Sequence, residues 1–164
     1  MKLNAGSAIY VPADCPHAYL SGNIVECMAR SNNVLNTGFC PRASRDNISL
    51  FTSALTFSPH NADEVLLPSE RSERGREGKT RIWAPPMGEF DMLKIELKKD
   101  EREVVRAVGG PSVLFATSGN GSMKADGQDF EIKEGYVFFV GQGVEVQFEA
   151  EGGEGLEVYW AFAE

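Results

Sequence analysis

The chain has 164 residues, of which 42% are hydrophobic and 24% charged, as in an ordinary globular protein with room for one domain and part of another. Its 16 basic and 24 acidic residues give a net charge of −8, which argues against a nucleic-acid-binding surface. No stretch approaches the roughly 20 apolar residues of a membrane span. The first residues lack the apolar run of a signal peptide, so we expect a cytoplasmic location without membrane partners.

Cysteine usage gives no sign of a disulfide framework. The three cysteines, Cys15, Cys27 and Cys40, are odd in number and nowhere spaced as Cys-x-x-Cys. We therefore expect reduced, partly buried thiols.

The first part of the chain, residues 6–29, contains short apolar runs separated by Pro, Gly and Asn. They predict three strands, at residues 8–11, 17–20 and 25–28. Three strands with an unfinished apolar face do not make a stable barrel, so we expect their partners upstream.

The first of these strands leads into a motif of fixed spacing. Gly6 is followed after five residues by Pro12, after one more by Asp14, and after two more by His17. Pro12 ends the strand and Asp14 bends the chain, so that the His17 imidazole can act as a neutral nitrogen ligand to a metal. A lone histidine on an apolar strand is more often a core or surface residue. The spacing, however, resembles the second half of the cupin metal motif and favours a ligand.

The residues that follow His17 resemble the type I mannose-6-phosphate isomerase family, in the stretch that closes its active site. The resemblance implies a mainly β fold: a cupin (RmlC-like jelly roll) domain, preceded by closing strands of a second cupin and one short helix. It covers nearly all of this chain but well under half of a family member, and the missing part is N-terminal. The matching segments are 16–22, 25–29, 31–34, 38–39, 84–86, 110–112, 124–127 and 135–139.

The resemblance also implies a site. The family holds zinc with Gln, His and Glu from its N-terminal half and with the histidine that His17 matches, so this chain carries one of the four expected ligands. It places Tyr19 and Glu26 in the pocket lining. Tyr19 either contacts a substrate hydroxyl or is a barrel-core aromatic. Glu26 stands in the apolar run 24–28, where a buried carboxylate must be paired or functional.

Two basic positions differ from the family pattern. Asn36 stands where the family has arginine, and Arg42 replaces a lysine, so that a cation for the substrate phosphate is kept. The spacing from there to Asp46 is one residue longer than usual, which leaves Arg45 as an alternative to Arg42. One imidazole alone offers only about millimolar zinc affinity, so we expect this chain by itself to lack a complete active site.

The middle of the chain predicts one helix and a connector. Residues 46–55 have apolar positions near helical spacing, with Ser44 or Asp46 as N-cap. Residues 56–79 lose this periodicity and end in a run of both charges at 70–79. That run favours a solvated connector over a phosphate clamp.

From residue 80 the pattern becomes a regular succession of strands, typical of a small sandwich or barrel. Asp126-Gly127 predicts a hairpin turn, and residues 119–121 predict another. The spacing from Gly135 to Gly143 repeats that of residues 6–14, but Val146 stands at the position of His17. The expected strands are 81–84, 91–97, 104–108, 112–117, 121–125, 128–132, 136–140, 144–149 and 156–162.

We therefore expect three regions: incomplete closing strands of a catalytic cupin (1–42), a short helix and charged connector (43–79), and a C-terminal cupin without metal ligands (80–164). The function implied by the resemblance is the C-terminal part of a zinc-dependent isomerase that interconverts mannose 6-phosphate and fructose 6-phosphate and feeds GDP-mannose synthesis. The alternative is a non-catalytic cupin that binds a sugar phosphate weakly or associates with a full-length isomerase or the missing N-terminal part. A cupin oxygenase is disfavoured, because neither unit has the His-x-His and Glu half of such a site.

Overall fold

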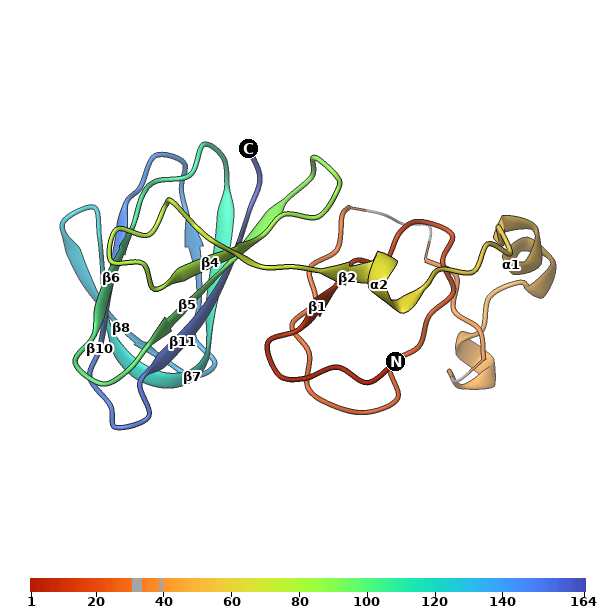
Figure 1. Cartoon of the computed structure of the whole chain (residues 1–164), viewed down its shortest axis with the longest axis horizontal. Helices are drawn as coiled ribbons and strands as arrows, with labels where there is room; N and C mark the ends of the chain where they lie inside the picture. Colours follow the sequence, from red (N-terminus) through yellow and green to blue (C-terminus); the bar gives the residue numbers. More distant parts are fainter. Residues whose placement is uncertain (31–33, 39) are drawn as a thin grey trace. The chain divides into compact units, whose positions relative to one another are not determined.

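The computed structural model describes residues 1–30, 34–38 and 40–164. The chain forms two compact units, Met1–Leu66 and Leu67–Glu164 (Figure 1). The second unit begins at Leu67 rather than at residue 80. Part of the expected connector forms a strand and is hydrogen-bonded to the sheet, as when the Ser72 amide donates to the Thr80 carbonyl at 2.9 Å.

The second unit is built on a nine-stranded antiparallel sheet. Its main path runs β3-β4-β5-β11-β7-β10-β6, and both β8 and β9 also pair with β7. The strands are β3 (Glu70–Arg71), β4 (Thr80–Trp83), β5 (Asp91–Leu97), β6 (Arg102–Val105), β7 (Ser112–Ala125), β8 (Gln128–Lys133), β9 (Val137–Val140), β10 (Val146–Ala150) and β11 (Leu156–Phe162).

The long strand β7 closes this sheet on itself. Its first half pairs with β11 and β9, and its second half pairs with β10 and β8. The turn expected at residues 119–121 was therefore wrong. The register shifts between Glu157 and Val158, and Gly119 takes a φ of 76°, so the chain bends and continues as one strand. This curled, two-layered sheet has the jelly-roll geometry of a cupin, and the expected fold class is confirmed.

The core lies between the two layers and follows the period-two alternation of the strands. In β11, for example, Val158 and Trp160 are fully buried, while Tyr159 between them is only partly covered. Val146, at the position that matches His17 in the repeat, is also a fully buried core residue. The hairpin predicted at Asp126-Gly127 is confirmed, with both residues at positive φ.

The first unit has little regular structure. Its described elements are β1 (Ala8–Ile9), a 3₁₀ turn (Arg42–Ser44), α1 (Ile48–Ala54) and α2 (Ala62–Val65). The short strand β2 (Leu66–Leu67), which pairs with β1, falls at the boundary between the two units. The predicted helix is present as α1, but its N-cap is Asn47, whose Oδ1 accepts from the Leu50 amide at 3.0 Å. The second helix, α2, was not predicted, although Asn61 and Glu64 form a capping box at its start.

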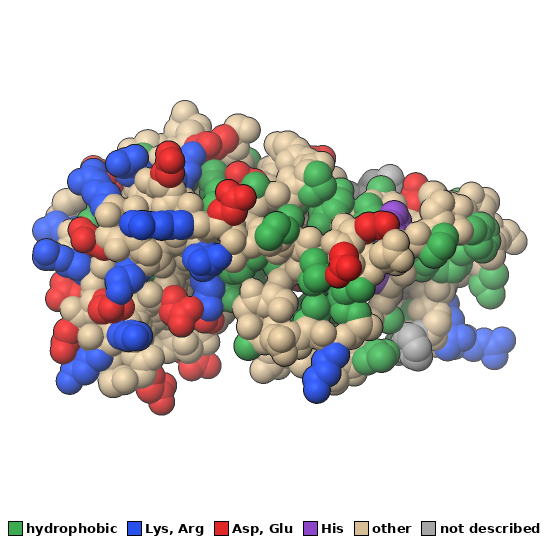
Figure 2. Space-filling view, viewed as in Figure 1, with side chains coloured by type: hydrophobic (Ala, Val, Ile, Leu, Met, Phe, Trp, Pro, Cys, Tyr) green, Lys and Arg blue, Asp and Glu red, His purple; other side chains and the backbone are tan. Residues whose placement is uncertain are grey.

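The strands predicted at 17–20 and 25–28 were wrong, because both segments are irregular. A strand exists only by pairing with a neighbour, and within the described residues these segments have no ladder partner. In the described part of the first unit no side chain is buried. Leu20, Met28 and Phe57 are 84%, 66% and 79% exposed, and Figure 2 shows hydrophobic side chains spread over this unit's surface. The unit therefore leaves the apolar residues of its expected strands uncovered.

None of the helices in the described ranges is long and apolar enough to cross a membrane.

Candidate functional site

The structure brings together three of the four site residues expected from the sequence. The Tyr19 hydroxyl donates to Glu26 Oε1 at 3.1 Å, and so joins the segments on either side of Gly22. The rings of Tyr19 and His17 meet edge to face, with centroids 5.6 Å apart and planes at 68°. An imidazole, a phenol and a carboxylate thus form one exposed cluster in the first unit.

The backbone sets the tautomer of His17. Its Nδ1 lies 3.1 Å from the Cys15 carbonyl oxygen, and since a carbonyl only accepts, Nδ1 carries the proton. In the neutral ring the lone pair then belongs to Nε2. A histidine oriented in this way by a backbone carbonyl is arranged as metal-ligating histidines are. The role of the Cys15 carbonyl was missed from the sequence, because a backbone acceptor leaves no signal in residue type.

Tyr19 remains a proton donor at neutral pH. Burial raises the pKa of its hydroxyl, and the hydrogen bond to the Glu26 carboxylate and that residue's negative charge raise the pKa further. Glu26, however, is exposed and not buried as expected, because the flanking Ile24 and Met28 are themselves 56% and 66% exposed. The pairing that the sequence argument required is still present, since Glu26 accepts the Tyr19 hydrogen bond.

Arg42 makes no hydrogen bond or ion pair with this cluster in the part of the chain that the structure describes. It is exposed at the start of the 3₁₀ turn, and among the described residues its guanidinium has no hydrogen bond or ion pair. The alternative cation, Arg45, donates through Nε to the Cys40 carbonyl at 3.1 Å. Asn36 is held by Asp46, which accepts from its amide at 2.5 Å and donates a backbone hydrogen bond back at 2.8 Å. The matching residues 31–33 and 39 lie outside the described part of the chain.

His17 fits a metal as a single ligand. In the described ranges no three His, Cys, Asp or Glu side chains are grouped closely enough to hold an ion. The residues present therefore supply one coordinating nitrogen and not a complete site.

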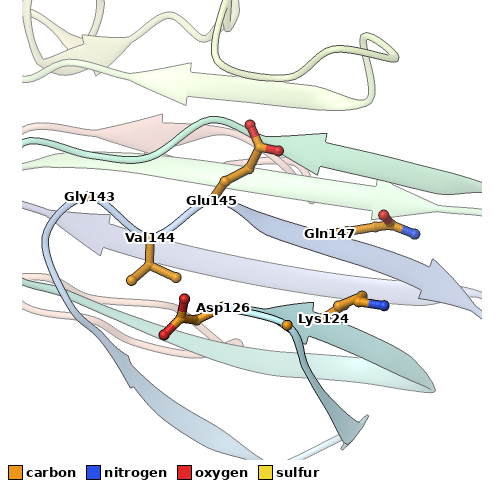
Figure 3. Close-up of a pocket in the computed structure, with 7 residues that line it drawn as sticks. Lys124, Asp126, Gly143, Val144, Glu145 and Gln147 are labelled. Carbon is orange, nitrogen blue, oxygen red and sulfur yellow. The ribbon is translucent and has the colours of Figure 1, made fainter.

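A hollow of about 350 Å³ lies in the second unit and includes none of the expected site residues. Figure 3 shows Lys124 on β7 and Asp126 just after it, opposite Glu145 just before β10 and Gln147 on β10. Glu145 is already paired with Arg76, and Lys124 lies 3.9 Å from Asp129. This mixed, open surface offers no set of convergent catalytic groups.

No family model matches the chain. Among curated proteins, it is 38% identical to the mannose-6-phosphate isomerase of Saccharomyces cerevisiae over 165 residues, covering 99% of this chain and 38% of that protein. It is 37% identical to the enzyme of the same name from Cryptococcus neoformans, covering 100% of this chain and 37% of that protein. The chain thus spans about two fifths of the length of these relatives.

Among solved structures, the chain is similar to mannose 6-phosphate isomerase from Salmonella typhimurium bound to fructose 6-phosphate and zinc, with a TM-score of 0.64 and 20% identity. The match covers 84% of this chain and 32% of that chain, and at this identity it supports the fold. The resemblance to mannose-6-phosphate isomerases that the sequence predicted is therefore confirmed, and it extends over nearly the whole of this chain.

Proposed function

We propose that this chain supplies the C-terminal part of a zinc-dependent mannose-6-phosphate isomerase, which interconverts mannose 6-phosphate and fructose 6-phosphate in the cytoplasm and feeds GDP-mannose synthesis. The observation that carries the proposal is the similarity to enzymes of that name along nearly all of the chain, at 38% and 37% identity. The Salmonella relative, which binds fructose 6-phosphate and zinc, supports a sugar phosphate as substrate and a metal as cofactor.

The cluster in the first unit has the groups that this reaction needs from the chain. His17 would hold the metal through Nε2, since Nδ1 is engaged with the Cys15 carbonyl. A bound zinc ion would polarise the sugar's oxygen atoms. Tyr19 would accept a hydrogen bond from a substrate hydroxyl, because its own hydroxyl already donates to Glu26 Oε1, which positions the phenol. Arg42 would hold the phosphate, because its guanidinium has no other partner among the described residues.

The site needs a partner segment. The described residues supply one of the expected ligands, and in that part of the first unit the apolar side chains lie at the surface without a core. About three fifths of the length of each relative has no counterpart in this chain. That part of an isomerase would cover the apolar surface and supply the remaining ligands. Its absence would leave unpaired strand segments exposed, which is an aggregation risk.

The test is complementation. This chain would be joined to the part of the Saccharomyces cerevisiae enzyme that it does not cover, and conversion of mannose 6-phosphate would be followed in a coupled assay. We expect turnover that His17→Ala abolishes and His60→Ala leaves unchanged, because His60 is in an exposed pair with Glu64 and is not one of the expected site residues. Equal turnover for the two variants, or no turnover for the joined protein without substitutions, would refute the proposal. A cupin without catalytic function would then remain.

A further inference from the structure

We infer that the second unit carries an anion site of its own, between Arg71 and Arg106, which takes a phosphomonoester or inorganic phosphate. The site is a hollow of about 490 Å³ lined by Arg71, Ser72, Glu73, Gly75 and Arg106. It lies in the charge run that the sequence assigned to a solvated connector. The structure instead folds this run against the sheet, and the hollow is a product of that folding.

The backbone around the hollow is hydrogen-bonded to the sheet at several points. The Ser72 amide donates to the Thr80 carbonyl, and the Arg106 amide donates to the Arg74 carbonyl, both at 2.9 Å. Gly75 forms a bridge with Val105 on β6. A side chain at Gly75 would place its Cβ 2.4 Å from Thr80 Oγ1, so only glycine permits this close approach. The lining is therefore held rigidly, which lowers the entropy lost when an ion binds.

The buried Glu103 strengthens this frame. It is fully buried, and its carboxylate accepts hydrogen bonds from the amides of Glu77 and Lys79 at 2.7 and 2.6 Å and from the Thr80 hydroxyl at 3.1 Å. Glu77 and Lys79 belong to the loop between β3 and β4, which contains Gly75, and Thr80 is the first residue of β4. Glu103 thus fixes one wall of the hollow from within the protein.

The arginines in and around the hollow differ in whether their guanidinium groups have partners. Neighbouring arginines are engaged elsewhere: Arg74 with Glu164, Arg76 with Glu145, and Arg81 with Ser69. Arg71 and Arg106, in contrast, form no ion pair or guanidinium hydrogen bond with any described residue. Glu73 also lines the hollow, so the three charged side chains there leave one net positive charge. The hollow thus keeps a net positive charge in a chain whose overall charge is −8.

Gly78 gives the guanidinium of Arg71 its place. A Cβ at Gly78 would lie 2.3 Å from Arg71 Nη2, so the head group rests on bare backbone. A planar guanidinium held in this way presents its donors in a fixed fork, the arrangement that matches a phosphate. Together with the exposed Arg106, this group suits a small dianion, with affinity that falls as salt increases.

The test uses the full chain, inorganic phosphate as the probe, and amide chemical shifts measured by NMR at low ionic strength. We expect saturable shifts at Gly75 and Arg106. Arg71→Gln or Arg106→Gln should weaken binding about tenfold, the effect of losing one charge-assisted contact. Glu73→Gln should tighten binding, because it removes the opposing charge. Arg102→Gln is the matched control, since Arg102 is an exposed arginine on β6 outside the hollow and should leave the affinity unchanged.

Shifts that rise linearly without saturation would overturn the inference, and so would equal losses in Arg102→Gln and Arg106→Gln. Fructose 6-phosphate, with fructose as the uncharged control, tests whether a phosphomonoester is accepted. Shifts confined to His17 and Tyr19 would place phosphate at the proposed isomerase site instead and reject the second site. This site is independent of the proposed isomerase function. His17→Ala should abolish turnover but leave phosphate binding at Arg71 and Arg106 unchanged.

Discussion

The buried carboxylate of Glu103 gives the sharpest prediction about stability. Its side chain is fully buried on β6, and four donors converge on it: the amides of Glu77, Lys79 and Val104 and the hydroxyl of Thr80. The Glu103→Ala change removes the acceptor and leaves these donors in place. We expect the second unit to lose much of its stability, and the loop between β3 and β4 to open first.

The magnitude follows from the number of donors left unpaired. A buried donor without a partner costs about 1–3 kcal/mol, and breaking a buried charged network typically costs about 3–5 kcal/mol. Water can reach the exposed side of the loop at Glu77, so we take the lower end, about 3 kcal/mol. For a domain of about 100 residues this corresponds to a fall in Tm of about 12 °C or more.

The assay is thermal unfolding of the full chain, followed by the near-ultraviolet signal of Trp83 and Trp160, both of which are buried in the second unit. Glu149→Ala on the neighbouring strand β10 is the control, because Glu149 is exposed and should change the free energy of unfolding by about 0.5 kcal/mol or less. Glu103→Gln keeps one acceptor oxygen and should lie between the two. A Tm for Glu103→Ala within a few degrees of the control would refute the network argument.

Three further predictions concern other parts of the chain. Burial alone would raise the pKa of Glu157, but hydrogen bonds from Lys94 and Thr117 outweigh this effect and lower the pKa. The Lys94–Glu157 pair therefore stabilises the fold above pH 4.5, and this contribution is lost as the pH falls through the lowered pKa. Lys94→Gln should flatten the acid side of the plot of urea midpoint against pH. Lys124→Gln, which removes an exposed lysine 3.9 Å from Asp129, should leave that plot unchanged, and identical plots for the two variants would contradict the prediction. Gly119→Ala should lower the free energy of unfolding in urea by more than about 2 kcal/mol, since its Cβ would lie 1.9 Å from the Gly155 carbonyl oxygen at a φ of 76°. Gly141→Ala, with open space around its Cβ, should lower it by less than about 1 kcal/mol. Equal losses in the two variants would exclude the close-approach argument. In the complemented enzyme, Tyr19→Phe should lower kcat/KM at least about tenfold, because it removes the hydroxyl that is hydrogen-bonded to the Glu26 carboxylate. Tyr10→Phe is the control, and an unchanged kcat/KM in Tyr19→Phe would exclude Tyr19 from the site.

The sequence predicted the second unit well because its signals are local. Alternating residues in β5 and β11 and the Asp126-Gly127 turn each depend on near neighbours, and all appear in the structure. The break expected at residues 119–121 failed because glycine marks both turns and bulges, and only the partner strands distinguish the two.

The first unit shows the opposite case. Residues 17–20 and 25–28 have the composition of strands, but strand formation depends on a pairing partner that composition does not supply. The family resemblance placed His17, Tyr19 and Glu26 at one pocket, and in the structure the three side chains contact one another, although the strands expected to carry them are absent. The loop at 72–79 was misjudged for a physical reason: the carboxylate that binds it, Glu103, lies more than twenty residues away in sequence.

The most direct test of the proposed function is the zinc content of the complemented protein, measured by elemental analysis after removal of loosely bound metal. We predict about one zinc per molecule in the unmodified protein and in His60→Ala, and loss of most of the metal in His17→Ala, since His17 would supply one of the four ligands in the proposed site. Full zinc content in His17→Ala would contradict the assignment of His17 as a ligand.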